Sequence, residues 1–209
     1  MLLPQFDRTP DADQSALEAI GCWIGKAPHP GTLAAMFQRA VEAAKRWISE
    51  TWYDERLRDG GVTSASNEAS LVLYGDFPGR RILLTGDAGI QALTMAAHHA
   101  DARGLPLQDF AFVQIPHHGS RRNVGPTILD RFLGPIRAEG DYSFSAFVSV
   151  PKDDEKYPRQ IVLNAFRRRG GRVLLTQGNK KVFPGGFATR PGYSPAQPTP
   201  FSPQVEEYD

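Results

Sequence analysis

Short apolar runs alternate with helix-like stretches through the middle of this chain of 209 residues. Runs rich in Leu, Ile, Val and Phe predict strands, and periodic stretches bounded by Gly or Pro predict helices. The strands are expected at 70–74, 81–85, 110–115, 143–150 and 172–176, and the helices at 90–103, 126–133 and 159–169. A Gly/Pro turn at 75–79 joins the first two strands as a hairpin. The alternation favours a layered α/β (α+β) architecture over a helical bundle or an all-β sandwich.

The flanks of this region have a different character. Apolar residues recur at three- and four-residue steps from Thr32 to Trp52, which predicts one amphipathic helix. Six of the 17 prolines follow Phe183, where periodicity fades, so an extended or disordered tail is expected there. The expected division is a connecting segment at 1–56, the layered region at 57–183 and a Pro-rich tail at 184–209.

Composition narrows the class of protein. With 41% hydrophobic residues, 22% charged residues and a net charge of +1, the chain is expected to be a soluble globular protein. The lone Cys22 excludes an intramolecular disulfide framework. No apolar run approaches the ~20 residues that span a bilayer, and the N-terminus turns polar too soon for a signal peptide, so we expect a cytoplasmic protein without a membrane partner. The balance of 24 basic against 23 acidic residues argues against nucleic-acid binding by bulk charge.

Two segments place acid and imidazole groups at the ends of expected strands. Asp87 follows the strand at 81–85 through a glycine, and His117 and His118 follow the strand at 110–115. Ligands and chemistry gather at the carboxyl ends of strands in layered α/β proteins. An alternative for Asp87 is that it caps the following helix, since aspartate is a favoured N-cap residue.

Imidazole is the commonest metal ligand, and two adjacent histidines leaving a strand allow one to bind metal while the other contacts substrate. Gly119 and Ser120 follow the pair and permit a tight turn. The second pair, His98 and His99, lies within an expected helix, where neighbours point ~100° apart, so no shared site is expected there.

Four runs together resemble a known family: 67–73 (Asn-Glu-Ala-Ser-Leu-Val-Leu), 81–87 (Arg-Ile-Leu-Leu-Thr-Gly-Asp), 115–120 (Ile-Pro-His-His-Gly-Ser) and 147–150 (Phe-Val-Ser-Val). Their order and spacing are similar to the second half of metallo-β-lactamase-fold hydrolases of the ComEC-like branch, which includes the C-terminal domain of the DNA-uptake competence protein. The resemblance covers about 120 residues, from Thr63 to Phe183. It implies half, or a degenerate form, of an αββα sandwich with a two-metal site along one edge.

By this resemblance, Asp87 would bridge two divalent ions, zinc or manganese. One of His117 and His118 would be a ligand, with His118 favoured, and the other imidazole would face the scissile group. Apart from the resemblance, Ser120, Arg121 and Arg122 follow the histidine pair closely and are the candidates for binding a phosphate at the edge of the site. The implied activity is hydrolysis of a phosphodiester or related ester, with nucleic acid as one possible substrate.

The departures from the family concern most of the metal ligands. Family members begin with a His-x-His-x-Asp-His strand, and this chain has histidines only at 29, 98, 99, 117 and 118. A later histidine before proline is also absent, because the chain reads Lys-Tyr-Pro-Arg at 156–159. The opening Leu-Leu-Pro-Gln-Phe at 2–6 resembles the segment that connects the two halves, which favours a truncated or separately encoded half over drift alone.

Three expectations follow from these departures. The chain alone should bind metal weakly, since it offers at most three ligands where zinc takes four. Asp87 and His118 should lie within reach of one ion. An apolar sheet face should remain uncovered, which predicts self-association or binding of a separately encoded N-terminal half.

The alternative function is an inactive remnant that serves as a binding subunit. A serine or cysteine nucleophile system is not favoured, since Ser120 lacks the Gly-x-Ser-x-Gly context.

Basic residues are concentrated late in the chain. Residues 157–205 hold eight basic side chains and no acidic one, including Arg167, Arg168 and Arg169 in the last turn of an expected helix. A solvated helix end explains these three, since cations complement the helix dipole. Phosphate binding is the alternative interpretation.

Overall fold

The structure is a computed structural model that describes residues 36, 47–154, 156–177, 180–188 and 191–208. The chain divides into two compact units, residues 1–47 with 207–209 and residues 48–206. The second unit therefore includes parts of the segments that sequence analysis placed before residue 57 and after residue 183. Within the described part of the chain, no helix combines the length and apolarity needed to cross a bilayer.

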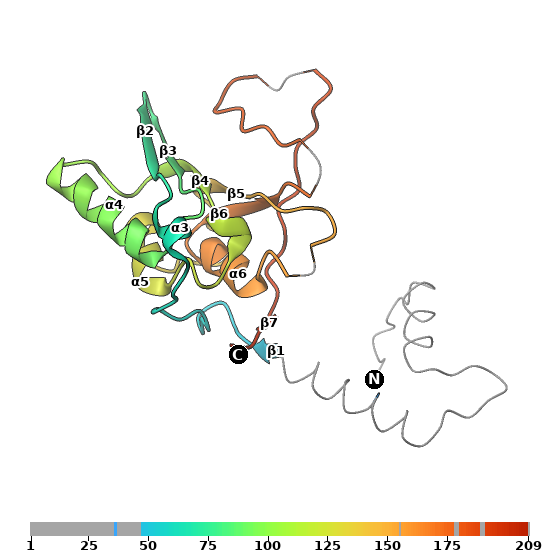
Figure 1. Cartoon of the computed structure of the whole chain (residues 1–209). Helices are drawn as coiled ribbons and strands as arrows, with labels where there is room; N and C mark the ends of the chain where they lie inside the picture. The colour runs from blue at the N-terminus through green and yellow to red at the C-terminus, as the bar shows by residue number, and fades with distance from the viewer. Residues whose placement is uncertain (1–35, 37–46, 155, 178–179, 189–190, 209) are drawn as a thin grey trace. The chain divides into compact units, whose positions relative to one another are not determined.

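A five-stranded mixed sheet with connecting helices forms this unit, so the expected α/β class is confirmed (Figure 1). The strand order is β2-β3-β4-β5-β6, in which β2 is antiparallel to β3 and the other neighbours are parallel. The strands are β2 (Leu73–Phe77), β3 (Arg80–Leu84), β4 (Phe110–Gln114), β5 (Phe144–Val148) and β6 (Gly171–Leu175). The helices between the parallel strands are α4 (Ile90–Ala102), α5 (Pro126–Leu133) and α6 (Gln160–Arg168).

One face of the sheet packs against these helices. Its side chains come from alternate positions of the strands, and Leu83, Val113, Ala146 and Val173 are all at most 3% exposed. A small cavity between sheet and helices is lined by Leu83 and Val113 together with residues of α4, α5 and α6, among them Leu93, Phe132 and Phe166. Three parallel connections that return to adjacent strands with the same right-handed sense place their helices on one face, as observed here.

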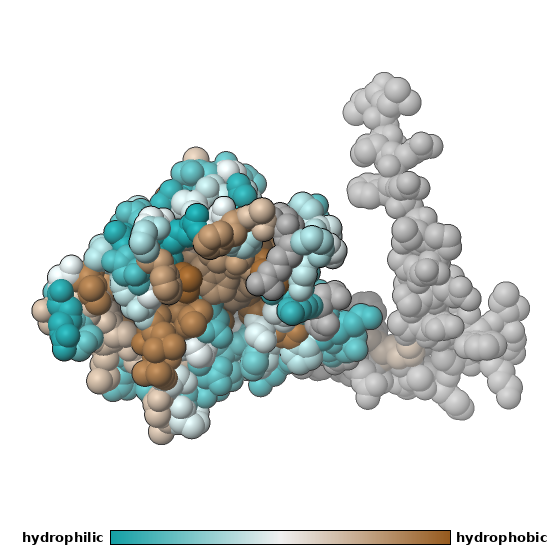
Figure 2. Space-filling view, turned by 90° about the horizontal axis from the view of Figure 1, so that it is seen from above, coloured by the Kyte–Doolittle hydropathy of each residue, from teal (hydrophilic) through white to brown (hydrophobic). Residues whose placement is uncertain are grey.

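The opposite face, which we call the apolar sheet face, carries Leu73, Phe77, Ile82, Leu84, Phe112 and Phe147. The register pairs Leu73 with Leu84 and Ile82 with Phe112, which puts them on the same side. Leu73 and Phe77 are 49% and 55% exposed. Among the described residues, Phe183 packs on this face, with its ring 5.2 Å from that of Phe112. Figure 2 shows hydrophobic surface gathered in the middle of the molecule, bordered by hydrophilic residues.

Two expected elements differ in the structure. The hairpin turns through two residues, Pro78 and Gly79, and β2 continues to Phe77, so the strand expected at 70–74 is shifted along the chain. The expected helix at 32–52 lies mostly outside the described residues, but its last part is wrong: Trp47–Ser49 forms β1, which pairs with β7 (Gln204–Glu206). Pairing with a strand from the other end of the chain overrides the local helical period.

The three arginines at the end of α6 are buried, which overturns both interpretations of them, the solvated helix end and the phosphate site. Arg167, Arg168 and Arg169 are 2%, 0% and 1% exposed. Arg168 forms an ion pair with the buried Glu50 at 3.0 Å, and Arg169 forms one with Glu55 at 2.9 Å. The segment 48–56 therefore supplies the carboxylates that allow these charges to be buried.

The burial of Arg167 is compensated differently, by polar oxygens. Its Nε donates to the carbonyl oxygen of Thr199 at 2.7 Å, and its Nη1 donates to Asn164 Oδ1 at 3.0 Å. Burial lowers the pKa of Arg167 to about 10, which leaves it charged at neutral pH. Burial also acts to lower the pKa of Arg169, but its hydrogen bonds and ion pairs with Glu55 and Asp130 outweigh burial and raise that pKa above its ordinary value.

The Pro-rich segment after Phe183 is extended, as expected, but its described residues pack against the unit. Phe201 lies against Trp52 with ring centres 5.5 Å apart, and Val205 is fully buried. Glu206 accepts hydrogen bonds from the backbone N–H groups of Gln160 (2.8 Å) and Ile161 (3.3 Å), which caps the N-terminus of α6. A tail that caps a helix and fills the core is part of the fold.

Candidate functional site

The carboxyl ends of β3, β4 and β5 meet at one edge of the sheet because the three strands are parallel neighbours. The loop with Asp87 follows β3, the turn with His117 and His118 follows β4, and Ser149 follows β5. The two segments that sequence analysis selected therefore lie in adjacent loops at the carboxyl edge of the sheet.

The turn after β4 has an unusual backbone. His117, His118 and Gly119 all have positive φ, at 43°, 56° and 80°. Such a conformation costs an ordinary residue roughly 1–3 kcal/mol and persists only where the surroundings impose it. Here the His117 N–H donates to Gly86 O at 3.1 Å, and Gly119 O accepts from the N–H of Arg159 at 3.1 Å. The β3 loop on one side and the segment before α6 on the other hold the turn in place.

The ring of His117 is oriented by Asn123, which is fully buried. The Asn123 amide donates to the carbonyl oxygen of Asp87 at 2.8 Å, so its oxygen faces His117 Nδ1 at 3.0 Å. Asn123 Oδ1 can only accept a hydrogen bond from Nδ1, whereas Asn67 Nδ2, 3.2 Å from the same Nδ1, can only donate one. In either tautomer Nδ1 is the engaged nitrogen of this ring. Asn123 thereby couples the Asp87 loop to this imidazole.

The ring of His118 is directed toward β5 instead. Its Nδ1 lies 2.5 Å from the carbonyl oxygen of Ser149, and the side chain is exposed. A carbonyl oxygen only accepts, so Nδ1 carries the hydrogen and Nε2 is the nitrogen left available. Both histidines therefore have Nδ1 engaged by partners from different segments, Asn123 in the loop before α5 and Ser149 directly after β5.

Tyr157 lies against both histidine rings. Its ring centre is 5.9 Å from that of His117 and 6.4 Å from that of His118, while the two imidazoles are 5.8 Å apart. Asp154 positions this segment, because one carboxylate oxygen accepts the N–H groups of Lys156 (2.9 Å) and Tyr157 (3.0 Å). Those two hydrogen bonds, and to a smaller extent the charge of His118, hold the pKa of Asp154 below its ordinary value.

Asp87 is half-buried and does not cap α4, so that alternative is wrong. The N-cap residue of α4 is Gly89, and the N–H of Ala92 in the first turn donates to Glu68 Oε2 at 2.7 Å. The N–H of Asp87 donates to Ser70 Oγ at 3.3 Å. The cap is supplied by α3 (Ala65–Glu68), which leaves the Asp87 carboxylate without that role.

The residues expected to help with a phosphate differ in accessibility. Ser120 and Arg121 are buried, at 4% and 8% exposed, and Arg122 is exposed. The hydroxyl of Ser120 accepts the N–H of Arg122 at 3.3 Å and so stabilises the turn. Of the three, Arg122 is the one whose side chain reaches solvent.

The described residues do not assemble a full metal-ligand set. Among them, no group of three or more His, Cys, Asp or Glu side chains lies close enough to hold an ion. The hydrogen bonds connect the Asp87 loop to His117 and connect His118 to Ser149, so the pairing of Asp87 with His118 stays a prediction. A surface groove of about 690 Å³ lies elsewhere, at the amino end of β4, lined by Asp101, Gln108 and Asp130 among others.

Sequence reasoning did not select Asn123, Asp154 or Tyr157 as part of the site. The sequence offers one weak indication that Asn123 belongs to the site, because it lies in a polar loop six residues after His117. Tyr157 stood out only as the residue in place of an expected histidine. Comparisons of the chain with models of known families, with curated proteins and with solved structures found no match.

Proposed function

We propose that this chain is the C-terminal half, or a truncated form, of a metal-dependent hydrolase of the metallo-β-lactamase type that acts on a phosphodiester or a related ester. The observation that carries the proposal is the meeting of the Asp87 loop and the His117–His118 turn at one sheet edge, joined through Asn123. The order of strands and helices from β2 to β6 supports it, since the four resembling runs fall on β2, β3, β4 and β5 or on the loops next to them.

The two-metal site that the resemblance implies does not fit the described residues. They offer Asp87 and two imidazoles at the edge, but no group of three carboxylate, thiolate or imidazole ligands in reach of one ion. The described residues therefore support no reaction step at a two-metal centre. A complete centre of that kind needs ligands from a His-x-His-x-Asp-His segment, which the sequence lacks.

The chain's own groups have defined capacities at this edge. Where the hydrogen of a neutral ring sits on Nδ1, His117 and His118 each present an Nε2 lone pair, which can accept a proton or coordinate a cation. The exposed guanidinium of Arg122 can attract a phosphate without first giving up an internal role. The buried Asn123 holds the His117 ring by its Nδ1 and so fixes the direction in which Nε2 points.

The proposal is tested by hydrolysis of bis-p-nitrophenyl phosphate and by elemental analysis of the same samples. The chain alone should be close to inactive, because its ligand set is incomplete. Co-expression with a neighbouring reading frame that encodes His-x-His-x-Asp-His should yield a complex that contains metal and hydrolyses the ester. The variant Asn123→Ala in that complex should lower kcat at least tenfold, since a misoriented imidazole loses its role. A metal-loaded complex without esterase activity would contradict the proposal.

The second candidate function is a binding subunit, and the apolar sheet face favours it. Exposed apolar side chains of β2 and β3 lie together there, which is typical of a surface that another polypeptide covers. In this case the residues at the carboxyl edge would have no catalytic role.

Association through the apolar sheet face is testable by light scattering. The full chain at high concentration should form dimers or larger species and bind a hydrophobic dye. The double variant Leu73→Glu/Phe77→Glu should shift it toward monomer, since charges are costly to bury in an interface. Met95→Glu is the matched control: Met95 is 65% exposed but lies on α4, away from this face, and its change should leave association as it was. A monodisperse monomer that binds no dye would show that the chain closes its own core.

A further inference from the structure

In both His117 and His118, Nδ1 is engaged by hydrogen-bonding partners and Nε2, within the described part of the chain, is not. In each ring Nδ1 lies within hydrogen-bond distance of an oxygen acceptor, Asn123 Oδ1 for His117 and the carbonyl oxygen of Ser149 for His118, and Asn67 Nδ2 is a second contact of His117 Nδ1. No hydrogen bond among the described residues engages Nε2 of either ring. This is the arrangement of metal-binding histidines, whose second nitrogen donates to a carbonyl or side-chain oxygen that fixes the ring.

The backbone beneath the two rings has an unfavourable conformation that hydrogen bonds maintain. The left-handed conformation of both histidines is unfavourable, and their ring centres lie 5.8 Å apart, whereas an extended strand would send successive side chains to opposite faces. Hydrogen bonds of Gly86 and Arg159 to the turn maintain that conformation. This turn, held by those hydrogen bonds, carries the two imidazoles side by side.

The ring of Tyr157 completes a triangle with the two imidazoles, with sides of 5.8, 5.9 and 6.4 Å between ring centres. Two imidazoles on one tetrahedral zinc have centres roughly 5 Å apart, and an imidazole and a phenol roughly 6 Å, given metal–ligand distances of about 2.0–2.1 Å. The observed sides lie within about 1 Å of these values, so the spacing of the three rings matches that of a three-ligand site. A phenol oxygen is a hard donor. Because it is neither a carboxylate, a thiolate nor an imidazole, a site with two imidazoles and a phenol is compatible with the absence, among the described residues, of three ligands of those types in reach of one ion.

We infer that His117 Nε2, His118 Nε2 and Tyr157 Oη form a binding site for a single divalent transition metal, with a fourth position open to solvent. The inference rests on the proposed function for the class of metal, and it adds a ligand that the resemblance does not supply. Binding releases the phenol proton to solvent and the metal–oxygen bond forms in its place, without a redox step. Asp154 is a positioning residue in this site, because it anchors the backbone of Tyr157.

The direct test is a zinc titration of the full chain by isothermal calorimetry. The wild-type chain should take up one equivalent of Zn²⁺, which a mild chelator removes because only three protein ligands hold it. The variant Tyr157→Phe keeps the aromatic ring and its packing but lacks the oxygen, and it should bind zinc at least tenfold more weakly. His117→Gln with His118→Gln should abolish binding. His98→Gln with His99→Gln is the matched control on α4, and it should bind like the wild type.

A spectroscopic measurement identifies the phenol directly. Cu²⁺ added to the wild-type chain should produce a visible phenolate-to-copper charge-transfer band, and Tyr157→Phe should lack that band. Thermal unfolding without metal should give similar midpoints for the wild type and Tyr157→Phe, which excludes loss of fold as the cause.

The outcomes separate this inference from the proposed function. Equal zinc affinity in the wild type and Tyr157→Phe, or a band that persists in the variant, overturns the role of Tyr157. Absence of zinc binding by the wild-type chain overturns the whole three-residue site, while an active complex with a partner would still support the proposed hydrolase. Zinc binding that depends on Tyr157, together with a complex that hydrolyses no ester, supports the site and overturns the hydrolase.

Discussion

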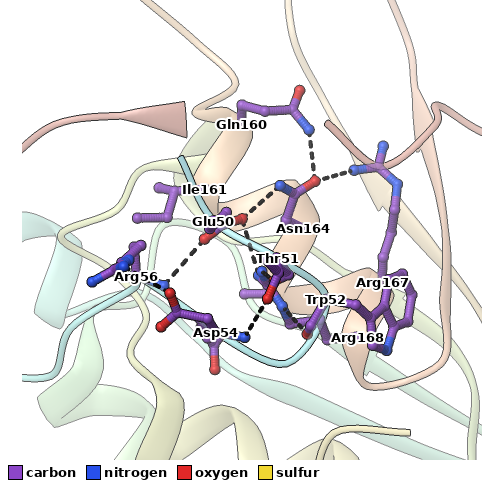
Figure 3. A network of polar contacts seen from close by, with 12 residues as sticks. Glu50, Thr51, Trp52, Asp54, Arg56, Gln160, Ile161, Asn164, Arg167 and Arg168 are labelled. Carbon is purple, nitrogen blue, oxygen red and sulfur yellow. Dashed lines mark hydrogen bonds and ion pairs between the residues drawn. The ribbon is translucent and has the colours of Figure 1, made fainter. Parts of the chain in front are cut away.

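Replacement of Glu50 by Gln is expected to lower the free energy of unfolding by about 3–5 kcal/mol. Glu50 is 1% exposed and lies among Asn164, Arg168 and the backbone N–H of Arg56 (Figure 3). Glutamine has the same size but no charge, so the guanidinium of Arg168 would be buried without a counter-ion. Removing one member of a buried ion pair costs more than the pair contributes, because the remaining charge stays desolvated. Denaturant unfolding of the full chain, followed by tryptophan fluorescence, measures the change.

Two further variants define the cause of that loss. Asp54→Asn removes a carboxylate from the same segment, but its ion pair with Arg56 is about half exposed on both sides, so a change of about 1 kcal/mol or less is expected. The double variant Glu50→Gln/Arg168→Met removes both charges and should recover most of the lost stability, since apolar replacement of a buried pair is often neutral. A loss below about 1 kcal/mol in Glu50→Gln would show that Arg168 is satisfied by the carbonyl oxygens of Thr51 and Trp52.

The ion pair between Glu50 and Arg168 also shows which features of the fold cannot be predicted from the sequence. The helix α6 was expected from its period and its Gly-Gly stop, and its bounds differ from the expected 159–169 by one residue at each end. The surroundings of its last turn were not foreseeable, because Glu50 and Arg168 are separated by 118 positions. A basic triplet at a helix end is usually solvated, and only the distant partners show that this one is buried.

In the candidate site, too, local patterns predicted the elements but not the contacts between distant residues. The strand ends after β3 and β4 were expected from local patterns, so Asp87 and the histidine pair could be placed at one edge. Which nitrogen of His117 is engaged depends on Asn123 and Asn67, and which nitrogen of His118 is engaged depends on the carbonyl of Ser149, which follows β5. Tyr157 reaches the histidines because the segment before α6 packs on Gly119, a contact that no local pattern encodes.

Gly119→Ala is expected to destabilise the unit by about 2–5 kcal/mol and to displace Tyr157 from the histidines. Gly119 has φ of 80°, where an L side chain costs roughly 1–2 kcal/mol. An added Cβ would also lie 2.8 Å from Cβ and 3.3 Å from Cα of Pro158, which follows Tyr157 directly. Relief of that overlap requires the segment at 156–159 to move away from the turn, because the ring of Pro158 has no rotamer to change.

Gly104→Ala separates the two contributions to this loss. Gly104 has φ of 66°, but nothing lies within 4 Å of the Cβ position, so this variant reports the backbone cost alone, about 1–2 kcal/mol. Gly119→Ala should exceed it by the overpacking cost of about 1–3 kcal/mol in denaturant unfolding. It should also weaken zinc binding in the calorimetric titration, whereas Gly104→Ala should not, because the latter changes a loop after α4 that does not contact the turn. If both variants lose equal stability and bind zinc equally, the packing of Pro158 on Gly119 has no part in positioning Tyr157.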